Sequence, residues 1–255
     1  MARLARGLAG LAGLLAVWEL ACAIGLLDAR YLPPPSTVLP RAAELLAGDT
    51  DFLLDSVATV LTFLIAVGLA ALIAIPLGLL LGSVRPARTA MLTVVEFLRP
   101  LPAVALLPLL MLLLGGGPGT KITLATYAAV WPILFNTMYA LDEMDPLYTD
   151  IARSFRFSRL RTACTVALPH AAPFVATGIR VSASIALVVV VVVELIAGGA
   201  RGVGTFILEA SSGGGRMDLV LAGTVIVGVL GYLINTGLHQ LQRRLFGWAT
   251  SREEL

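Results

Sequence analysis

The chain has 255 residues, of which 58% are hydrophobic and 13% are charged, and its mean hydropathy is +0.92. Soluble domains carry about 25% charged residues, so this composition excludes an ordinary soluble enzyme, a disordered chain and a nucleic-acid-binding domain. The formal net charge of +2 is too small to indicate a strongly charged partner. The composition instead predicts an all-α, polytopic membrane protein that forms a single transmembrane domain over residues 1–255.

Several stretches are long and apolar enough to cross a bilayer, which takes about 20 residues per helix. The predicted transmembrane helices are 8–27, 57–82, 91–114, 122–141, 174–197 and 219–238. The first stretch follows Arg3 and Arg6, as a cleaved secretory signal would. Glu19 interrupts its apolar run, however, and we expect this segment to remain as a helix.

The basic residues predict the direction of the spans, because cytoplasmic loops carry an excess of arginine and lysine. Placing the N-terminus inside puts most of the arginines on the cytoplasmic side, so both termini are predicted to be cytoplasmic. The outer segment 28–56 is then acidic, and its residues 41–47 are expected to form a short interfacial helix.

The third predicted span contains Glu96, Arg99 and three prolines, at positions 100, 102 and 108. Each proline removes a backbone donor, so the helix should break or kink. Broken backbone at membrane depth is tolerated only against protein or a water-filled cavity. Glu96 and Arg99 lie one helical turn apart and are expected to neutralise each other, so this broken segment is predicted to line the cytoplasmic half of a path. The alternative is a mutually neutralising pair that rests at the inner interface.

Three more polar residues are candidates for a path or gate. Asn136 and Tyr139 lie on the fourth predicted span at helix-face spacing. Glu194 lies near the end of the fifth, where an ionisable side chain is costly and is a functional candidate by default. We expect Glu194 to bond helix ends in an outer gate near Gly198, and the alternative is a purely structural hydrogen bond.

The largest predicted cytoplasmic loop covers residues 142–173. Asp145 and Pro146 are typical of a helix start, with aspartate as the cap and proline in the first turn. Phe155, Phe157 and Leu160 then supply apolar anchors among four arginines. This pattern favours a docking element, with an amphipathic helix on anionic lipid as the alternative.

Catalytic and nucleotide-binding motifs are missing from the sequence. It contains no Gly-x-x-x-x-Gly-Lys-Ser/Thr loop, no Gly-x-Ser-x-Gly elbow and no cluster at metal-ligand spacing. We therefore predict a protein that is not an enzyme and binds no cofactor or metal. An ion-coupled secondary transporter or channel subunit remains as the alternative, although the inverted repeats of such transporters are not apparent.

Residues 150–159 read Asp-Ile-Ala-Arg-Ser-Phe-Arg-Phe-Ser-Arg and are followed by Ala-Leu-Pro at 167–169. This pattern resembles the EAA loop of the binding-protein-dependent ABC importer permeases. Further motifs, in chain order, resemble the nitrate/sulfonate/taurine branch of that family. They are Trp-Glu-Leu at 18–20, Leu-Pro-Pro-Pro-Ser-Thr-Val-Leu at 32–39, Ile-Pro-Leu-Gly at 75–78, Leu-Arg-Pro-Leu-Pro at 98–102 with Leu-Pro at 107–108, and Glu194.

The resemblance implies a type I ABC importer fold with six transmembrane helices, and a permease subunit in the bacterial cytoplasmic (inner) membrane. It implies partners that this chain does not contain. These are two ATPase subunits that use ATP and Mg, a second permease subunit, and an extracytoplasmic binding protein that delivers a small solute. Membrane lipid surrounds the assembly, and no nucleic acid is involved.

The resemblance also assigns the loop 142–173 as the element that couples the permease to the ATPase. The coupling residues carried over are Asp150, Ala152, Arg153, Phe155, Arg156, Phe157, Ser158, Arg159, Leu168 and Pro169. The aromatic residues would anchor in a groove of the partner, the arginines would pair with its carboxylates, and Pro169 is expected to end the second short helix.

Arg156 stands where the family has a glycine that makes the turn between two short helices. A residue with a side chain costs roughly 1–2 kcal/mol in the left-handed region, so we expect this turn to be reshaped or strained. One hypothesis is a pairing with a different permease subunit that keeps the glycine. The alternative is a homodimer with a modified turn.

Overall fold

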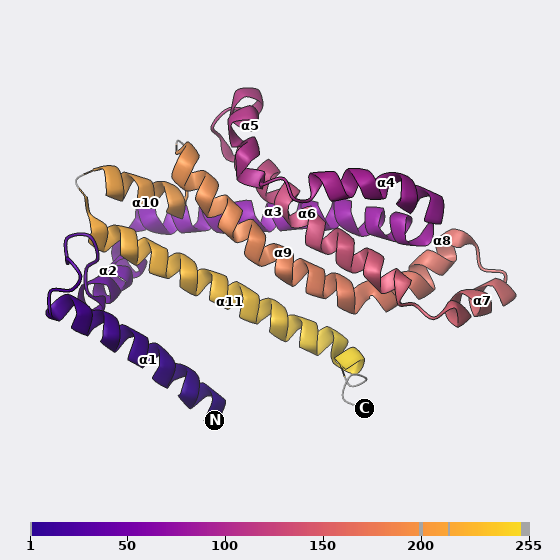
Figure 1. The fold of residues 1–255 in the computed structure, drawn as a ribbon, viewed down its shortest axis with the longest axis horizontal. Helices are drawn as coiled ribbons and strands as arrows, with labels where there is room; N and C mark the ends of the chain where they lie inside the picture. Colours follow the sequence, from indigo (N-terminus) through magenta and orange to yellow (C-terminus); the bar gives the residue numbers. More distant parts are fainter. Residues whose placement is uncertain (1, 199–200, 214, 251–255) are drawn as a thin grey trace. The chain divides into compact units, whose positions relative to one another are not determined.

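The computed structural model describes residues 2–198, 201–213 and 215–250, and within these ranges it is helical and contains no strand (Figure 1). The first elements are α1 (Ala2–Ala23), α2 (Pro35–Gly48), α3 (Thr50–Ser83), α4 (Arg85–Leu98), the 3₁₀-helix η1 (Ala103–Leu106) and α5 (Leu107–Leu114). They are followed by α6 (Pro118–Asp142), α7 (Pro146–Ser154), α8 (Arg159–Thr162), the π-helix η2 (Ala163–Ala167), α9 (Leu168–Ala197), α10 (Val203–Ser212) and α11 (Met217–Thr250).

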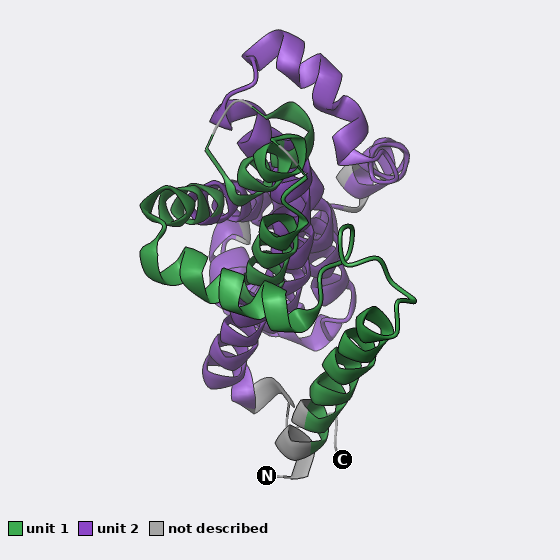
Figure 2. Cartoon of the chain, turned by 90° about the vertical axis from the view of Figure 1, so that its left-hand side faces the viewer, with its two compact units in different colours: residues 1–59, 194–230 green, residues 60–193, 231–255 purple. Residues whose placement is uncertain are grey.

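The chain divides into two compact units, which are described separately below (Figure 2). Unit 1 contains residues 1–59 and 194–230, and unit 2 contains residues 60–193 and 231–255. The long helices α3, α9 and α11 contribute residues to both units.

Four helices of the described chain are long and apolar enough to cross a membrane. They are Thr50–Ser83, Pro118–Asp142, Leu160–Ala197 and Met217–Gly247, and they contain the predicted spans 57–82, 122–141, 174–197 and 219–238. The predicted span 91–114 corresponds to a bent pair of helices, which would make a fifth crossing. The predicted span 8–27 overlaps α1, whose apolar part Ala9–Ala23 is shorter, so a sixth crossing stays a prediction.

The expected break in the third span is confirmed. Helix α4 ends at Leu98, and the chain resumes with η1 at Ala103 and α5 at Leu107. Pro102 precedes η1 and Pro108 lies in the first turn of α5, where its missing N–H costs no helical bond. Figure 1 shows α5 directed away from the axis of α4.

A row of small residues on α3 sets the packing of unit 2. Ala66, Ala70 and Ala74 are fully buried at intervals of four residues, and the row continues through Gly78 and Gly82. A Cβ on Gly78 would lie 2.7 Å from Thr137 Cβ, and one on Gly82 would lie 2.6 Å from Leu141 Cδ1. Small residues let helix backbones approach closely in membranes, so α3 packs tightly along α6, and the matching order of contacts makes the two helices parallel.

Helix α9 packs antiparallel to α6 and to α11 within unit 2. A Cβ on Gly178 would lie 2.9 Å from the Cα of Ile133, and the Ser182 hydroxyl donates to the Ala129 carbonyl at 2.6 Å. On the side of α11, the Gln242 amide donates to the Thr177 hydroxyl at 2.8 Å. Side-chain hydrogen bonds and small residues thus join the helices at both contacts.

The core of unit 1 brings the outer segment against α10 and the start of α11. Its buried members are Ala42, Leu45, Phe52, Val203, Ile207, Ala222 and Ile226. Phe52 packs its ring edge-to-face with Phe206 at a centroid distance of 4.8 Å, an arrangement that aromatic quadrupoles favour.

Two predicted boundaries are wrong, and one helix was not predicted. The helix expected at 41–47 extends over Pro35–Gly48, because Pro35 suits the first helical position and Pro40 lies early enough to be tolerated. Helix α1 ends at Ala23 rather than Leu27, and the chain turns through Gly25 with φ +74°. Helix α10 was not expected, because its glycine-rich surroundings give no clear periodicity.

Candidate functional site

Helix α7 begins at the predicted cap. The Asp145 carboxylate accepts a hydrogen bond from the Leu147 N–H at 2.9 Å, and Pro146 occupies the first helical position. The cap satisfies a donor that the helix leaves without an internal partner. The start of the candidate coupling hairpin, which we define as α7, α8 and the turn between them, therefore follows from two adjacent residues.

The turn between α7 and α8 keeps the glycine-type geometry without the glycine. Arg156 has φ +54° and is the only non-glycine residue with positive φ in the described chain. The Phe157 N–H donates to the Ala152 carbonyl at 3.0 Å, and the Arg156 N–H donates to the Arg153 carbonyl at 2.8 Å. These two bonds form a Schellman motif with Arg156 at the left-handed position. The expected strain at Arg156 is thus present.

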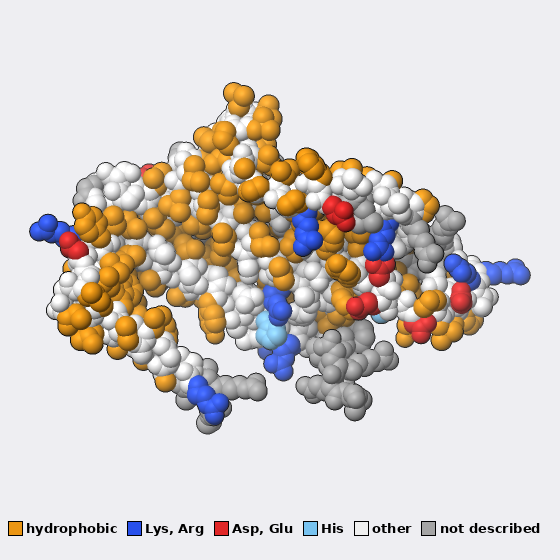
Figure 3. Space-filling model, in the orientation of Figure 1, with side chains coloured by type: hydrophobic (Ala, Val, Ile, Leu, Met, Phe, Trp, Pro, Cys, Tyr) orange, Lys and Arg blue, Asp and Glu red, His pale blue; other side chains and the backbone are white. Residues whose placement is uncertain are grey.

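The hairpin exposes large apolar side chains next to charged ones. Phe155 and Leu160 are 72% and 76% exposed, and Tyr148, Leu147 and Ile151 are exposed as well. Ala152 is buried, as its place under the turn requires. Figure 3 shows basic and acidic side chains gathered over this part of unit 2, whereas hydrophobic side chains cover much of the helical surface seen there.

The arginines of the hairpin have different local roles. Arg153 forms a surface ion pair with Asp150 at 3.1 Å. The Arg161 guanidinium lies 4.1 Å from the centre of the Phe157 ring, in a cation–π contact. Ser158 precedes α8, and its hydroxyl accepts a hydrogen bond from the Arg161 N–H at 3.3 Å. The side chain of Arg159 lies outside the part of the chain that the structure describes.

Pro169 does not end the second short helix, so that expectation is wrong. Helix α8 continues through η2 into α9, and the whole segment Leu160–Ala197 forms one apolar helix. The Leu168 N–H donates to the Ala163 carbonyl, five residues back. Pro169 has no N–H to donate, and a wider π turn keeps its ring away from the preceding carbonyls. Leu168 and Pro169 therefore lie where the hairpin continues into α9 without an intervening loop.

Glu194 is the centre of a buried polar network in unit 1. Its carboxylate is fully buried and accepts a hydrogen bond from the Thr59 hydroxyl, whose oxygen lies 2.9 Å from Oε2 and 3.1 Å from Oε1. Thr59 accepts in turn from the Val203 N–H at 2.9 Å, and the Gly204 N–H donates to Glu194 Oε2 at 3.0 Å. The network joins α3, α9 and α10.

The position of this carboxylate suits the start of α10, because unpaired N–H groups at a helix N-terminus favour negative charge. Gly202 makes the approach possible. A Cβ at Gly202 would lie 2.2 Å from Glu194 Cδ, a distance that no side chain tolerates. Glu194 thus bonds a helix end, as expected, although the helix is α10 and the partners come from Gly204 and Thr59.

The other path candidates lie in unit 2. Glu96 and Arg99 are exposed, and no ion pair joins them in the described structure. Arg99 instead lies over the Phe135 ring at 4.5 Å. Asn136 donates to the Pro132 carbonyl at 2.8 Å, and Tyr139 is 59% exposed one turn further along α6. The expected Glu96–Arg99 neutralisation is therefore replaced by a contact between Arg99 and an aromatic ring.

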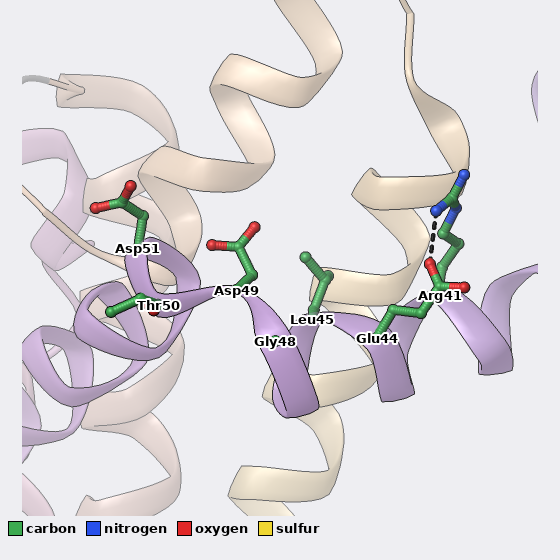
Figure 4. Close-up of a pocket in the computed structure, with 7 residues that line it drawn as sticks. All are labelled: Arg41, Glu44, Leu45, Gly48, Asp49, Thr50 and Asp51. Atoms are coloured by element: carbon green, nitrogen blue, oxygen red, sulfur yellow. Dashed lines mark hydrogen bonds and ion pairs between the residues drawn. The ribbon is translucent and has the colours of Figure 1, made fainter.

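A pocket of about 460 Å³ lies where α2 meets α3 in unit 1, lined by the residues labelled in Figure 4. Its charged groups already have partners. Arg41 pairs with Glu44 at 2.6 Å and with Asp218 at 3.3 Å, Asp49 accepts from the Phe52 N–H, and Asp51 pairs with Arg201. The Asp218 carboxylate also accepts from Arg216 and raises the pKa of that guanidinium above its ordinary value. The pocket is thus lined by an ion-pair network that connects α2 with the start of α11.

Comparison with known proteins decides the family. Residues 74–247 match the model of the family described as binding-protein-dependent transport system inner membrane component. The chain belongs to this permease family. The taurine transport system permease of Escherichia coli K12 is 32% identical over 243 residues, which cover 93% of this chain and 87% of the relative.

Further relatives and a solved structure agree with the family. The bicarbonate transport system permease of Synechococcus elongatus is 28% identical, over 92% of this chain and 87% of its own length. Others are named as aliphatic sulfonate and nitrate permeases. The inward-facing MetNI methionine ABC transporter matches with a TM-score of 0.66 at 19% identity, over 75% of this chain and 94% of the matched chain. The fold is that of a type I ABC importer permease, and the expected nitrate/sulfonate/taurine branch is confirmed.

Sequence reasoning missed three residues of the network around Glu194 in this permease. Thr59 and Gly204 are separated from Glu194 by 135 and 10 residues, and a lone threonine in an apolar span gives no signal. Gly202 offered a weak one, because a glycine just before a helix permits a close approach. The break in the third predicted span, in contrast, was recognisable from its prolines.

Proposed function

We propose that this permease, which forms the translocation path of an ABC importer, is driven through its α7–α8 hairpin by a separate ATPase subunit. The observation that carries the proposal is the exposure of Phe155 and Leu160 at the tip of the hairpin, beside basic residues. Exposed aromatic anchors with neighbouring arginines suit a groove lined by apolar and acidic groups. Asp150, Ala152, Arg153, Phe155, Arg156, Phe157, Ser158 and Arg159 form the docking element.

Motion of the ATPase would reach the membrane through the continuous helix that begins in the hairpin. Leu168 and Pro169 lie where α8 runs into α9 without a loop. A rigid connection transmits a displacement of the hairpin as a tilt of α9, the kind of rigid-body movement that exchanges access between two sides. Glu96, Arg99, Asn136 and Tyr139 are proposed to line the path, and Glu194 to hold the outer gate.

The assembly we propose contains two ATPase subunits, two permease subunits and an extracytoplasmic binding protein, in the bacterial inner membrane with both termini of this chain cytoplasmic. The relatives are named for taurine, bicarbonate, sulfonates and nitrate. All of these solutes carry an oxyanion group at neutral pH, and we propose a small oxyanion as the solute here. The strain at Arg156 supports a partner permease that keeps the glycine.

The test measures capture of the ATPase subunit by the tagged permease, together with ATP-dependent uptake in proteoliposomes. Phe155→Ala should weaken capture by roughly tenfold or more, because an aromatic hot spot contributes about 2 kcal/mol or more. Phe97→Ala is the matched control, since Phe97 is 71% exposed but lies outside the hairpin. Equal capture by the Phe155→Ala variant and the unchanged permease would reject the hairpin as the docking element.

The composition of the permease pair is tested separately. Native mass spectrometry of the purified complex should reveal two different permease chains if Arg156 is compensated by a partner that keeps the glycine. A complex with two copies of this chain alone would reject that pairing and favour the modified turn.

A further inference from the structure

Arg180 and His239 form a polar pair between two apolar helices of unit 2. Arg180 lies on α9, His239 lies on α11, and the guanidinium NH1 is 2.7 Å from the imidazole Nδ1. We propose that this pair binds the oxyanion group of the transported solute, which extends the proposed function by naming a contact site within the path.

The geometry determines which protons the imidazole carries. A guanidinium has only donors, so His239 Nδ1 must accept. The neutral ring then carries its hydrogen on Nε2, which is a donor. The pair therefore keeps one imidazole N–H and four further guanidinium N–H groups, and in the described structure no carboxylate pairs with Arg180. Planar donors of this kind suit a small oxyanion.

Polar residues continue on both sides of the pair. One turn toward the start of α9, Gln242 donates to the Thr177 hydroxyl at 2.8 Å. One turn in the other direction, the same antiparallel register places Ser184 beside Asn235, and both are exposed. The contact between Gly231 and Leu187 agrees with this register, because a Cβ on Gly231 would lie 3.2 Å from Leu187 Cδ2. Thr177, Gln242, Arg180, His239, Ser184 and Asn235 thus form a polar track along α9 and α11.

Some residues of the polar track are exposed, whereas another polar residue of α9 is buried. Ser182 is fully buried and satisfied by the Ala129 carbonyl of α6. His239, Ser184 and Asn235 are exposed on helices that are otherwise apolar enough to span a membrane. Polar side chains at membrane depth face a water-filled cavity or another chain rather than lipid. A water-filled path for a polar solute would provide hydrogen-bond partners for these side chains.

The sign of the charge selects the ligand. Arg243 follows His239 by one helical turn on α11 and is exposed, so it adds positive charge to the same region. Arg180 lies six residues inside the predicted span 174–197, about 9 Å along the axis at 1.5 Å per residue, and His239 directly follows the predicted span 219–238. The pair lies between two helices of the permease, so we take a free anion that moves through the path, rather than a lipid phosphate, as its ligand. We therefore assign the site to a small, free oxyanion.

The test observes the ring nitrogens of the histidines by NMR. The chain has two histidines, so His170 serves as an internal control. The ¹⁵N-histidine-labelled permease complex in phosphatidylcholine nanodiscs is titrated with sodium nitrate and with sodium methanesulfonate, and with sodium chloride at equal ionic strength. The His239 resonances should shift saturably with either oxyanion and not with chloride, while those of His170 stay unchanged.

Variants link the response to the pair. Arg180→Gln should remove the saturable shift, and Arg180→Lys, which keeps the charge, should weaken it by roughly tenfold because the planar donors are lost. Thr224→Val, at an exposed polar residue of α11 that lies outside the track, should retain it. A shift that is absent, that chloride reproduces, or that appears only in nanodiscs with phosphatidylglycerol would overturn the assignment.

The result is independent of the docking proposal. Capture of the ATPase by the hairpin should be the same for Arg180→Gln as for the unchanged permease, because the substituted residue lies outside the hairpin. Loss of capture by Phe155→Ala with an unresponsive His239 would reject the anion site alone. A responsive His239 with unchanged capture by Phe155→Ala would reject the docking element alone.

Discussion

Two single residues of this permease, Arg156 and Gly202, differ in how their side chains suit the local backbone. Arg156 has a side chain where the turn requires a left-handed residue, with φ +54°. Gly202 lacks a side chain where a buried carboxylate occupies the space that a Cβ would fill. Arg156 places a charged side chain at the hairpin tip, and its backbone is strained as a result. Glycine at position 202 avoids a clash, so that Glu194 can reach α10.

Replacing Arg156 by glycine should stabilise the hairpin by about 1 kcal/mol, because glycine adopts the left-handed region without the steric cost. Hydrogen exchange of the Phe157 amide should slow by roughly fivefold, since this amide closes the turn onto the Ala152 carbonyl. Arg156→Ala is the control, because it removes the charge and keeps the strain. Faster exchange in the glycine variant would contradict the assignment of strain to this residue.

Gly202→Ala should destabilise the permease by about 2–4 kcal/mol, since the new methyl group displaces the Glu194 carboxylate and leaves buried donors of Thr59 and Gly204 unpaired. Unfolding by sodium dodecyl sulfate, followed by tryptophan fluorescence, measures the change. Gly228→Ala, at a helical position with no atom within 4 Å, should be neutral or slightly stabilising. Equal stability of both variants would show that the network around Glu194 contributes little.

At the scale of elements, close helix contacts follow from small residues that recur at every fourth position of a helix. The row Ala66, Ala70, Ala74, Gly78 and Gly82 lies on one side of α3 and permits the tight contact with α6. The lipid-facing side of the same helix carries exposed leucines and isoleucines. Because lipid is as apolar as leucine, packing rather than the hydrophobic effect joins these helices.

A methyl group at Gly78 should therefore be costly. Its Cβ would lie 2.7 Å from Thr137 Cβ and 3.2 Å from the Leu134 carbonyl oxygen, so α6 must move. Gly78→Ala should lower the stability by about 1–3 kcal/mol in the same unfolding titration. Gly68→Ala, on the same helix with no atom within 4 Å, is the control. No difference between these variants would contradict a tight α3–α6 contact.

Elements whose signal is local were predictable from the sequence. The Asp145 cap, the break before Pro102 and the long apolar helices depend on residue types at short spacing. The left-handed turn at Arg156 was predictable because of the resemblance to the EAA loop. The prediction at Pro169 was wrong, because a proline that a π turn accommodates within a continuous helix has the same local signature as a helix end.

Contacts between distant residues were not predictable in the same way. The Glu194–Thr59 bond spans 135 residues and the Arg180–His239 pair spans 59. Each residue by itself is a lone polar side chain in an apolar segment, and only the packing of the helices shows which of them meet. Helix α10 was missed because the glycines around it interrupt any periodic pattern.

At the scale of the whole molecule, the hairpin that we propose to lie outside the membrane continues into a helix long enough to cross it. The α7–α8 hairpin exposes its apolar tip, α8 continues into α9, and α9 carries Arg180 near its middle. A displacement of the hairpin by a partner would therefore move the helix that bears the proposed anion site. In the proposed assembly, this arrangement would let nucleotide-driven motion in the ATPase subunit change access to a solute in the permease.

Photo-crosslinking from the hairpin tip tests this account most directly. Phe155 is replaced by p-benzoylphenylalanine in the assembled importer within native membranes, with the same replacement at the similarly exposed Phe97 as the control. Irradiation should join the residue at position 155 to the ATPase subunit, with a yield that changes when ATP and Mg are added, and should not join the residue at position 97. Adducts of position 155 with lipid alone, or equal adducts from both positions, would contradict the account.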